Sequence, residues 1–282
     1  MSTLCANESR EHPNAPANGR MAPKVALQDP VLGPLTDDLL TRDVRVYQRA
    51  KGHRFSSDDV ATAYVAFKAR PSARRVLDLG CGLGSVLLHL AWKLPEAELT
   101  GVEAQAMSFE LLKRNVARSG FAERVQIHHG DLRDTALLSS FGGGFELVTG
   151  TPPYFPRGTG TESAKTHAAA ARFEHRGGVE DYLAVAAQRV APGGRIAICS
   201  AALERDRVAT TVRALDLGHL EHWAIVPRAG KQALVMVDVL VPSPVAAPAC
   251  HELVVRDLDG RWTSAFQEVR AALGMPSTPP RA

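Results

Sequence analysis

The sequence predicts a doubly wound, Rossmann-like α/β fold with a mostly parallel sheet, and three observations support this. A glycine-rich turn, Val76–Gly84, joins an apolar run to a helical pattern. Two further apolar runs end in the acids Glu103 and Asp131. Short apolar runs then keep alternating with amphipathic stretches, which is typical of βαβ units. Since ligands of such sheets bind at the carboxyl ends of the strands, we look for function there.

Before the glycine turn, the chain predicts a tail, a hairpin and a helix. Residues 1–24 are rich in Asn, Ala, Pro, Ser and Gly without periodicity, which indicates disorder. Residues 44–48 alternate as a short strand, and apolar residues over 60–67 recur at helical spacing. Ser57 or Asp58 is the expected N-cap of that helix. We expect this segment to cover one edge of the sheet.

The glycine turn predicts a strand, a tight turn and a helix N-terminus. Its glycines, including Gly80 and Gly82, permit positive φ and close approach of a ligand to the backbone. The spacing is G-x-G-x-G, whereas a dinucleotide fingerprint would need glycine at Ser85. Asp78 precedes the first glycine by two residues. A carboxylate there would repel a pyrophosphate and attract an ammonium, such as the α-amino group of S-adenosylmethionine (AdoMet).

Two more acids end the next predicted strands, 98–103 and 124–131. Glu103 lies about 20 residues past the glycines, where an acid usually holds ribose hydroxyls. Asp131 can accept a hydrogen bond from the adenine amine. One such acid is more often a helix cap or a solvated turn, but three at successive strand ends favour a cofactor site. The expected AdoMet contacts here are Asp78, Gly80, Gly82, Glu103, Ala104, Asp131 and Leu132.

The rest of the chain predicts further alternation and a final hairpin. Apolar periodicity indicates helices over 104–119, 132–141, 179–191 and 203–215, and strands over 145–150, 195–199, 220–226 and 233–241. The last two strands are close enough for a hairpin, so one antiparallel partner is expected near the sheet edge. A Pro/Ala linker through Pro248 should lead to a strand over 252–257, a turn at Asp259–Gly260 and a helix over 264–273 capped by Thr263.

The glycine turn and the strand-end acids resemble class I AdoMet-dependent methyltransferases over about residues 45–242. The stretch Gly52–Asp58 resembles the segment before the glycine turn in bacterial tRNA adenine-N6 methyltransferases and the related small-domain methyltransferases. In that family the segment folds over the AdoMet site. The resemblance therefore implies that Phe55, Ser56 and Asp58 line the cofactor.

A second motif, Thr151-Pro152-Pro153-Tyr154, follows the fourth core strand. The prolines fix φ and restrict the preceding residue, so the backbone carbonyls are rigidly aimed. An exocyclic amine has its lone pair delocalised into the ring. Acceptors on its two hydrogens would localise that pair on nitrogen and orient it for in-line attack, so catalysis is mostly positioning. Tyr154 offers a ring face to a planar target.

This motif resembles the [NDS]-P-P-[YFW] sequence of amino-methyltransferases that act on adenine, cytosine or glutamine amides. In those enzymes the Asn side-chain oxygen and the first proline's carbonyl are the acceptors. The resemblance implies catalytic roles for Thr151, Pro152, Pro153 and Tyr154, with Thr151 also lining the cofactor. Thr151 stands where the motif has Asn, and its hydroxyl reaches less far than an amide.

Basic residues near both motifs are candidates for phosphate contacts. The flexible, basic segment that follows the Pro-Pro turn is expected to form a lid over the substrate. For any single residue, a solvated surface charge is the more frequent outcome. The candidates are Arg157, Lys165, Arg172 and Arg176 in the lid, and Arg42, Arg45, Arg49, Lys51 and Arg54 upstream.

Composition narrows the class of protein. The 282 residues are 45% hydrophobic and 22% charged with a net charge of +3, which is ordinary for a globular chain and compatible with RNA. The four cysteines show no C-x-x-C spacing, so neither a metal site nor a disulfide framework is expected. No apolar run reaches about 18 residues, and the first segment lacks a signal-peptide core. We expect a cytoplasmic enzyme without a membrane partner.

The expected parts of the chain are a disordered tail (1–28), a hairpin and helix covering the cofactor site (29–72), the methyltransferase domain (73–242), a strand–helix appendage (243–275) and a second tail (276–282). The preferred function is AdoMet-dependent methylation of an adenine amine in RNA, most simply tRNA. Two alternatives stay open: the same chemistry on a protein amide or a small molecule, and a scaffold that binds AdoMet or RNA without catalysis. The sequence indicates no oligomeric state.

Overall fold

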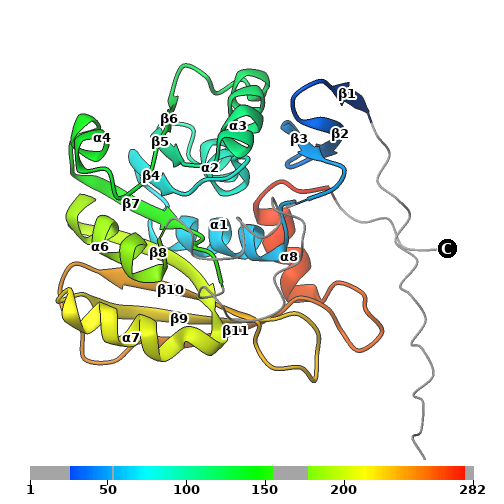
Figure 1. The fold of residues 1–282 in the computed structure, drawn as a ribbon. Coiled ribbons are helices and arrows are strands. Elements are labelled where there is room, and N and C mark those ends of the chain that lie inside the picture. The colour runs from blue at the N-terminus through cyan, green and yellow to red at the C-terminus, as the bar shows by residue number, and fades with distance from the viewer. Residues whose placement is uncertain (1–25, 53, 155–176, 277–282) are drawn as a thin grey trace, which may run out of the picture.

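The computed structural model describes residues 26–52, 54–154 and 177–276 (Figure 1). Its strands are β1(Leu27–Asp29), β2(Gly33–Leu39), β3(Arg45–Arg49), β4(Arg75–Leu79), β5(Glu98–Glu103), β6(Val125–His129), β7(Phe145–Gly150), β8(Val190–Ala201), β9(Gly218–Val226), β10(Val235–Val241) and β11(Ala249–Val254). Its helices are α1(Ser57–Ala69), α2(Ser85–Lys93), α3(Ala106–Ser119), α4(Thr135–Ser140), α6(Val179–Arg189), the 3-10 turn η1(Ala202–Glu204), α7(Arg205–Ala214) and α8(Ser264–Ala272).

The main sheet has eight strands in the order β11-β9-β10-β8-β7-β4-β5-β6. Strands β8, β7, β4, β5 and β6 run parallel, and β10 is antiparallel to both β8 and β9. The predicted doubly wound fold with an antiparallel hairpin is confirmed. Because the strand order reverses on either side of β4, the carboxyl end of β4 is the topological switch point, where such sheets bind ligands.

Two hydrophobic cores lie on the two faces of this sheet. One gathers side chains of α1, α2, α3 and α8, and the other gathers those of α4, α6 and α7. Neighbouring residues of β4 alternate between them, since Val76 belongs to the first core and Leu77 to the second. Figure 1 shows α6 and α7 together along one side of the sheet and α1 crossing the other.

The N-terminal segment forms a separate antiparallel sheet, β1-β2-β3, where the sequence predicted a hairpin. Its strand β3 packs against α3. Asn115 of α3 bonds both backbone groups of Tyr47, accepting from its N–H at 2.7 Å and donating to its carbonyl at 3.1 Å. The same amide donates to the carbonyl of Leu83 at 2.9 Å, so one side chain ties this sheet to the glycine turn.

Helix α1 begins one residue earlier than the sequence predicted. Its N-cap is Ser56, and the expectation of Ser57 or Asp58 was wrong. Ser56 Oγ accepts from the N–H of Asp58 at 3.3 Å, and Asp59 Oδ2 accepts from the N–H of Ser56 at 2.8 Å. This reciprocal capping box satisfies two backbone donors at once, which favours Ser56 over its neighbours.

The C-terminal segment completes the edge of the main sheet. Strand β11 pairs parallel with β9 and begins three residues before the predicted strand. Thr263 caps α8 as predicted, with its hydroxyl accepting from the N–H of Phe266 at 3.1 Å. Helix α8 packs against α1. Within the described ranges, no helix combines the length and apolarity needed to cross a bilayer.

Candidate functional site

Three acids meet at the carboxyl edge formed by β4, β5 and β6. Asp78 is the fourth residue of β4, Glu103 is the last of β5, and Asp131 comes two residues after β6. In the parallel ladder Asp78 lies opposite Gly101, and Glu103 lies opposite His129. The sheet therefore brings together the acids that the sequence assigned to one site.

Asp78 is buried, and only one of its two carboxylate oxygens has a hydrogen-bond partner among the described residues. Its Oδ1 accepts a hydrogen bond from the Thr149 hydroxyl at 2.7 Å, while its Oδ2 has no partner among the described residues. Burial raises the pKa of Asp78 to about 7, with smaller contributions from the acids Asp59 and Glu103. A buried carboxylate oxygen without a donor is costly, and a cationic ligand would remove that cost.

Glu103 braces the glycine turn. Its Oε2 accepts from the N–H of Gly82 at 2.8 Å, and its Oε1 accepts from the N–H of Gln105 at 2.6 Å. A carboxylate oxygen can accept more than one hydrogen bond, which suits the ribose role that the sequence assigns to Glu103. Gly82 has φ 56°, and a Cβ placed on it would meet no atom within 4 Å. The backbone at Gly82 is therefore open to close approach by a ligand.

Asp131 and its neighbour Leu132 are engaged within the protein. Arg133 holds both oxygens of Asp131, with Nε at 2.9 Å from Oδ1 and Nη2 at 2.7 Å from Oδ2. The side chain of Leu132 packs in the core with residues of α4 and α6, so it is not free to contact a ligand. Ala104, the other residue expected at a strand end, is half-buried beside Glu103.

The Pro-Pro-Tyr turn leaves β7, which is the neighbour of β4. Pro152 is buried, and Thr151 and Pro153 are half-buried. The Tyr154 hydroxyl donates to Asp58 Oδ2 at 3.2 Å and lies 3.4 Å from the sulfur of Cys199. Burial raises the pKa of both Tyr154 and Asp58. The segment before the glycine turn thus holds the turn after β7.

Phe55 and Ser56, also predicted to line the site, have structural partners. The backbone N–H of Phe55 donates to Gln48 Oε1 at 2.9 Å, and its ring packs against the core beneath α1. Ser56 is the N-cap described above. The predicted lid residues of 157–176 lie outside the described part of the chain.

Two residues that shape this edge were not predicted from the sequence. Tyr182 of α6 packs over Gly80 and Gly150, because a Cβ on either glycine would overlap the tyrosine side chain. Burial raises the pKa of Tyr182, and Glu103 and Asp78 raise it further. Nothing in the α6 sequence distinguishes this tyrosine from an ordinary core residue.

Asp59 is the second residue that the sequence reading missed. Its Oδ1 accepts from the Ser85 hydroxyl at 3.0 Å, so it ties α1 to the N-terminus of α2 beside the glycine turn. The capping-box spacing from Ser56 to Asp59 was the signal that could have identified it.

Three of the five basic residues of the upstream cluster pair with acids of the same N-terminal segment. Arg45 pairs with Asp37 at 3.1 Å, and Arg54 pairs with Asp38 at 2.9 Å. Arg42 pairs with the aspartate that follows it, at 3.0 Å. The cluster therefore presents less positive charge to a phosphate backbone than its arginine count indicates.

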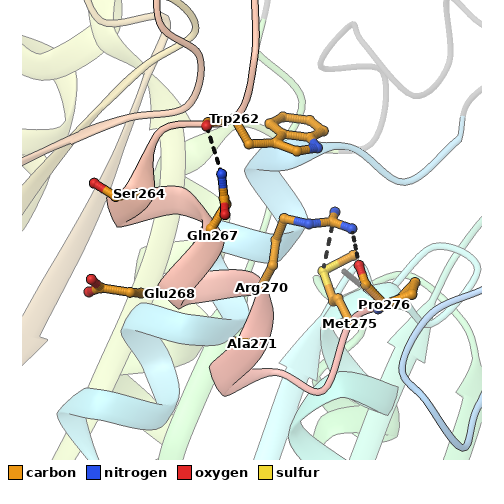
Figure 2. Close-up of a pocket in the computed structure, with 8 residues that line it drawn as sticks. All are labelled: Trp262, Ser264, Gln267, Glu268, Arg270, Ala271, Met275 and Pro276. Carbon is orange, nitrogen blue, oxygen red and sulfur yellow. Dashed lines mark hydrogen bonds between the residues drawn. The ribbon is translucent and has the colours of Figure 1, made fainter. Parts of the chain in front are cut away.

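A pocket of about 450 Å³ lies at the other end of the chain and contains none of the predicted site residues (Figure 2). It is lined by α8, Trp262 and the segment after the helix. Figure 2 shows Arg270 extending across it, with Nη2 donating to the Pro276 carbonyl at 2.7 Å and Nη1 4.0 Å from the sulfur of Met275. The candidate site remains the strand edge.

Comparison with known sequences gives a family and named relatives. Residues 55–204 match the family model described as methyltransferase small domain. A tRNA1(Val) (adenine(37)-N6)-methyltransferase of Porphyromonas gingivalis is 32% identical over 133 residues, which cover 47% of this chain and 50% of that one. A protein of the same name from Glaesserella parasuis is 26% identical over 202 residues, covering 71% and 82%. The first match thus spans half the length of the curated relative.

Comparison with solved structures supports the fold. A structure described as a predicted O-methyltransferase from Agrobacterium tumefaciens superposes with a TM-score of 0.59 at 19% identity, covering 79% of this chain and 99% of that one. TYW2 from Pyrococcus horikoshii in complex with MeSAdo gives 0.52 at 15% identity, covering 74% and 72%. At these identities the likeness extends to the arrangement of strands and helices.

Proposed function

Because this chain belongs to the methyltransferase small domain family, with a class I fold and AdoMet as its cofactor, we propose that it methylates an exocyclic amine of adenine in RNA. The observation that carries the proposal is the position of the Pro-Pro-Tyr turn. It leaves β7 beside the glycine turn that follows β4, and Tyr154 is anchored there by Asp58. Bound AdoMet supplies an electrophilic methyl group on a sulfonium.

The residues at the strand edge fit this cofactor. The partnerless Oδ2 of Asp78 suits the ammonium of its amino acid, and the open backbone at Gly82 suits close approach of the same part. We assign the ribose to Glu103 and the adenine amine to Asp131, which would share its oxygens with Arg133. The other residues assigned to the cofactor are Phe55, Ser56, Asp58, Gly80, Ala104, Leu132 and Thr151.

The turn after β7 would bind the amine that is methylated. We assign the carbonyl of Pro152 and the hydroxyl of Thr151 as acceptors for its two hydrogens, with Pro153 fixing the turn. The ring of Tyr154 would stack on the base, which must be unpaired or flipped to reach it. These acceptors would aim the nitrogen lone pair at the methyl group that the cofactor would supply, and the surplus proton of the amine would pass to water.

The proposed methyl acceptor is inferred from the names of the similar proteins. Those named above are tRNA1(Val) (adenine(37)-N6)-methyltransferases, so we propose a tRNA adenine as the substrate and the cytoplasm as the place of action. The net charge of +3 is compatible with a polyanionic substrate.

The test is methyl transfer from labelled AdoMet to total tRNA, a protein extract and a metabolite pool, measured side by side with the full chain. The proposal expects label in tRNA and N6-methyladenosine among the digested nucleosides. An unmodified tRNA transcript with a single adenine replaced by guanine serves as the matched control for position. Label only in protein or metabolites would contradict the RNA assignment but keep the methyltransferase. That second outcome stays open because Thr151 departs from the asparagine of the amino-methyltransferase motif.

A further inference from the structure

Two histidines and an aspartate gather on β9 and β10, on the far side of β8 and β7 from the glycine turn. His222 lies directly opposite Asp238 in the antiparallel ladder, and His219 lies opposite Leu240. The register shifts between Val239 and Leu240. Such a bulge adds one residue to β9, so histidines three positions apart reach the same face of the sheet.

The three side chains are close enough to share one cation. One ligand atom from each of His219, His222 and Asp238 lies within 4.8 Å of the others. His222 Nδ1 hydrogen-bonds Asp238 Oδ1, and His219 Nδ1 lies 3.8 Å from the same oxygen. Ligand atoms around a tetrahedral zinc ion are about 3.3 Å apart, given bonds of about 2.0–2.1 Å. Small side-chain rotations would therefore bring the three ligand atoms to the spacing that a zinc ion needs.

The hydrogen bond between His222 and Asp238 does not explain why His219 lies beside them. Both its ring nitrogens are buried, and neither has a hydrogen-bond partner among the described residues. Leaving such groups unpaired is costly, whereas a metal ion would use a nitrogen lone pair directly. The imidazole rings of His219 and His222 lie side by side, with centroids 4.5 Å apart and planes inclined by 38°.

The cluster is also reachable and well supported. The side chains of His219 and His222 are 17% and 28% exposed, so the cluster lies near the protein surface, while Asp238 is 5% exposed. Ile198 and Leu240, the neighbours of Asp238 on the same face, belong to the core packed under α7. The ligands therefore stand on rigid strands rather than on loops.

We propose that His219, His222 and Asp238 bind a divalent transition-metal ion of the zinc class, which links β9 to β10. Two imidazoles and one carboxylate suit Zn²⁺ and related ions better than Mg²⁺ or Ca²⁺, which prefer oxygen ligands. Three protein ligands leave a fourth position for water. Because β8 and β7 separate this cluster from β4, its role is structural, and its test is binding and stability rather than methyl transfer.

The test titrates the chelator-treated full chain with Zn²⁺ alone, by calorimetry and by a competing chromophoric chelator. The proposal expects one ion bound at micromolar Kd or tighter, and a thermal midpoint that rises with Zn²⁺. His219→Gln, His222→Gln and Asp238→Asn should each weaken binding at least tenfold and remove the thermal shift. His251→Gln, which removes an imidazole from the neighbouring strand β11, is the matched control and should bind as the wild type does.

The absence of saturable Zn²⁺ binding in the wild type would overturn the proposal and leave an ordinary His222–Asp238 hydrogen bond. Undiminished binding in the three variants would place any zinc elsewhere. The glutamine and asparagine replacements keep side-chain volume, and circular dichroism verifies their folding. If one variant fails to fold, the visible spectrum of the wild-type Co²⁺ derivative decides, since nitrogen and oxygen ligation in a four-coordinate site gives intense absorption that octahedral Co²⁺ in water lacks.

Discussion

The buried carboxyl of Asp78 should make AdoMet binding depend on pH. In the ligand-free protein its pKa is about 7, because burial disfavours the charged form. The ammonium of bound AdoMet would favour that charged form and lower the pKa. Binding then requires Asp78 to be ionised, so affinity should rise as pH increases and level off above about pH 7.

The size of the effect follows from the pKa. If the ligand-free value is about 7 and the bound value lies well below 5, Kd should be about tenfold weaker at pH 6 and about 100-fold weaker at pH 5 than at pH 8. One pKa unit corresponds to about 1.36 kcal/mol, so the loss at pH 5 is about 2.7 kcal/mol. Asp78→Asn cannot ionise. It should bind AdoMet about 10- to 100-fold more weakly at pH 8 and lose this pH dependence.

Isothermal titration calorimetry between pH 5 and pH 8 measures this directly. Methylthioadenosine, which lacks the amino acid, is the matched control ligand and should bind with a nearly constant Kd over the same range. A flat AdoMet profile in the wild type would refute the assignment of Asp78 to the ammonium. If the AdoMet Kd of Asp78→Asn depended on pH as steeply as that of the wild type, a group other than Asp78 would be responsible for the pH dependence.

The other predictions concern stability and the turn after β7. For ligand-free Asp78, a pKa raised above its unfolded value means that the folded state binds the proton more tightly. Stability is therefore lost as pH rises from about 4 to about 7, so Asp78→Asn should melt higher than the wild type at pH 8 and equally at pH 4, by calorimetry. Tyr154→Phe should lower kcat less than tenfold, because it releases the turn from Asp58. Tyr154→Ala should also lose base stacking of about 1–3 kcal/mol, which would appear as a larger fall in kcat/KM. Equal losses in the two variants would contradict a stacking role. Thr151→Asn should raise methyl transfer to RNA if the site is an amine site weakened by the shorter hydroxyl, and a loss of transfer to every acceptor would show instead that Thr151 is a specialisation.

The order of strands and helices was predictable because it depends on local patterns. The glycine turn, the apolar runs and the helical spacing each report on their own segment, and Thr263 was recognisable as a cap from its neighbours alone. The positions of Asp78 and Glu103 followed from the rule that parallel strands present their carboxyl ends together. The N-cap of α1 was misplaced by one residue because several adjacent polar residues compete for that position.

What the sequence could not predict depends on contacts between distant segments. The Tyr154–Asp58 hydrogen bond joins residues that are far apart along the chain, and the pairing of Asp131 with Arg133 depends on side-chain conformation. The cluster on β9 and β10 was missed for a similar reason. Strict alternation places His219 and His222 on opposite faces of a strand, and only the bulge brings them together.

The central claim is that AdoMet lies across the ends of β4, β5 and β6 with its methyl group toward Pro152. A crystal structure with sinefungin, which carries an amine in place of the methyl sulfonium, tests this most directly. The account predicts the ammonium of the ligand's amino acid at Asp78 Oδ2, the ribose at Glu103 and the added amine near the Pro152 carbonyl. Sinefungin bound away from this edge, or excluded from it by Tyr182 packed over the glycine turn, would contradict the account.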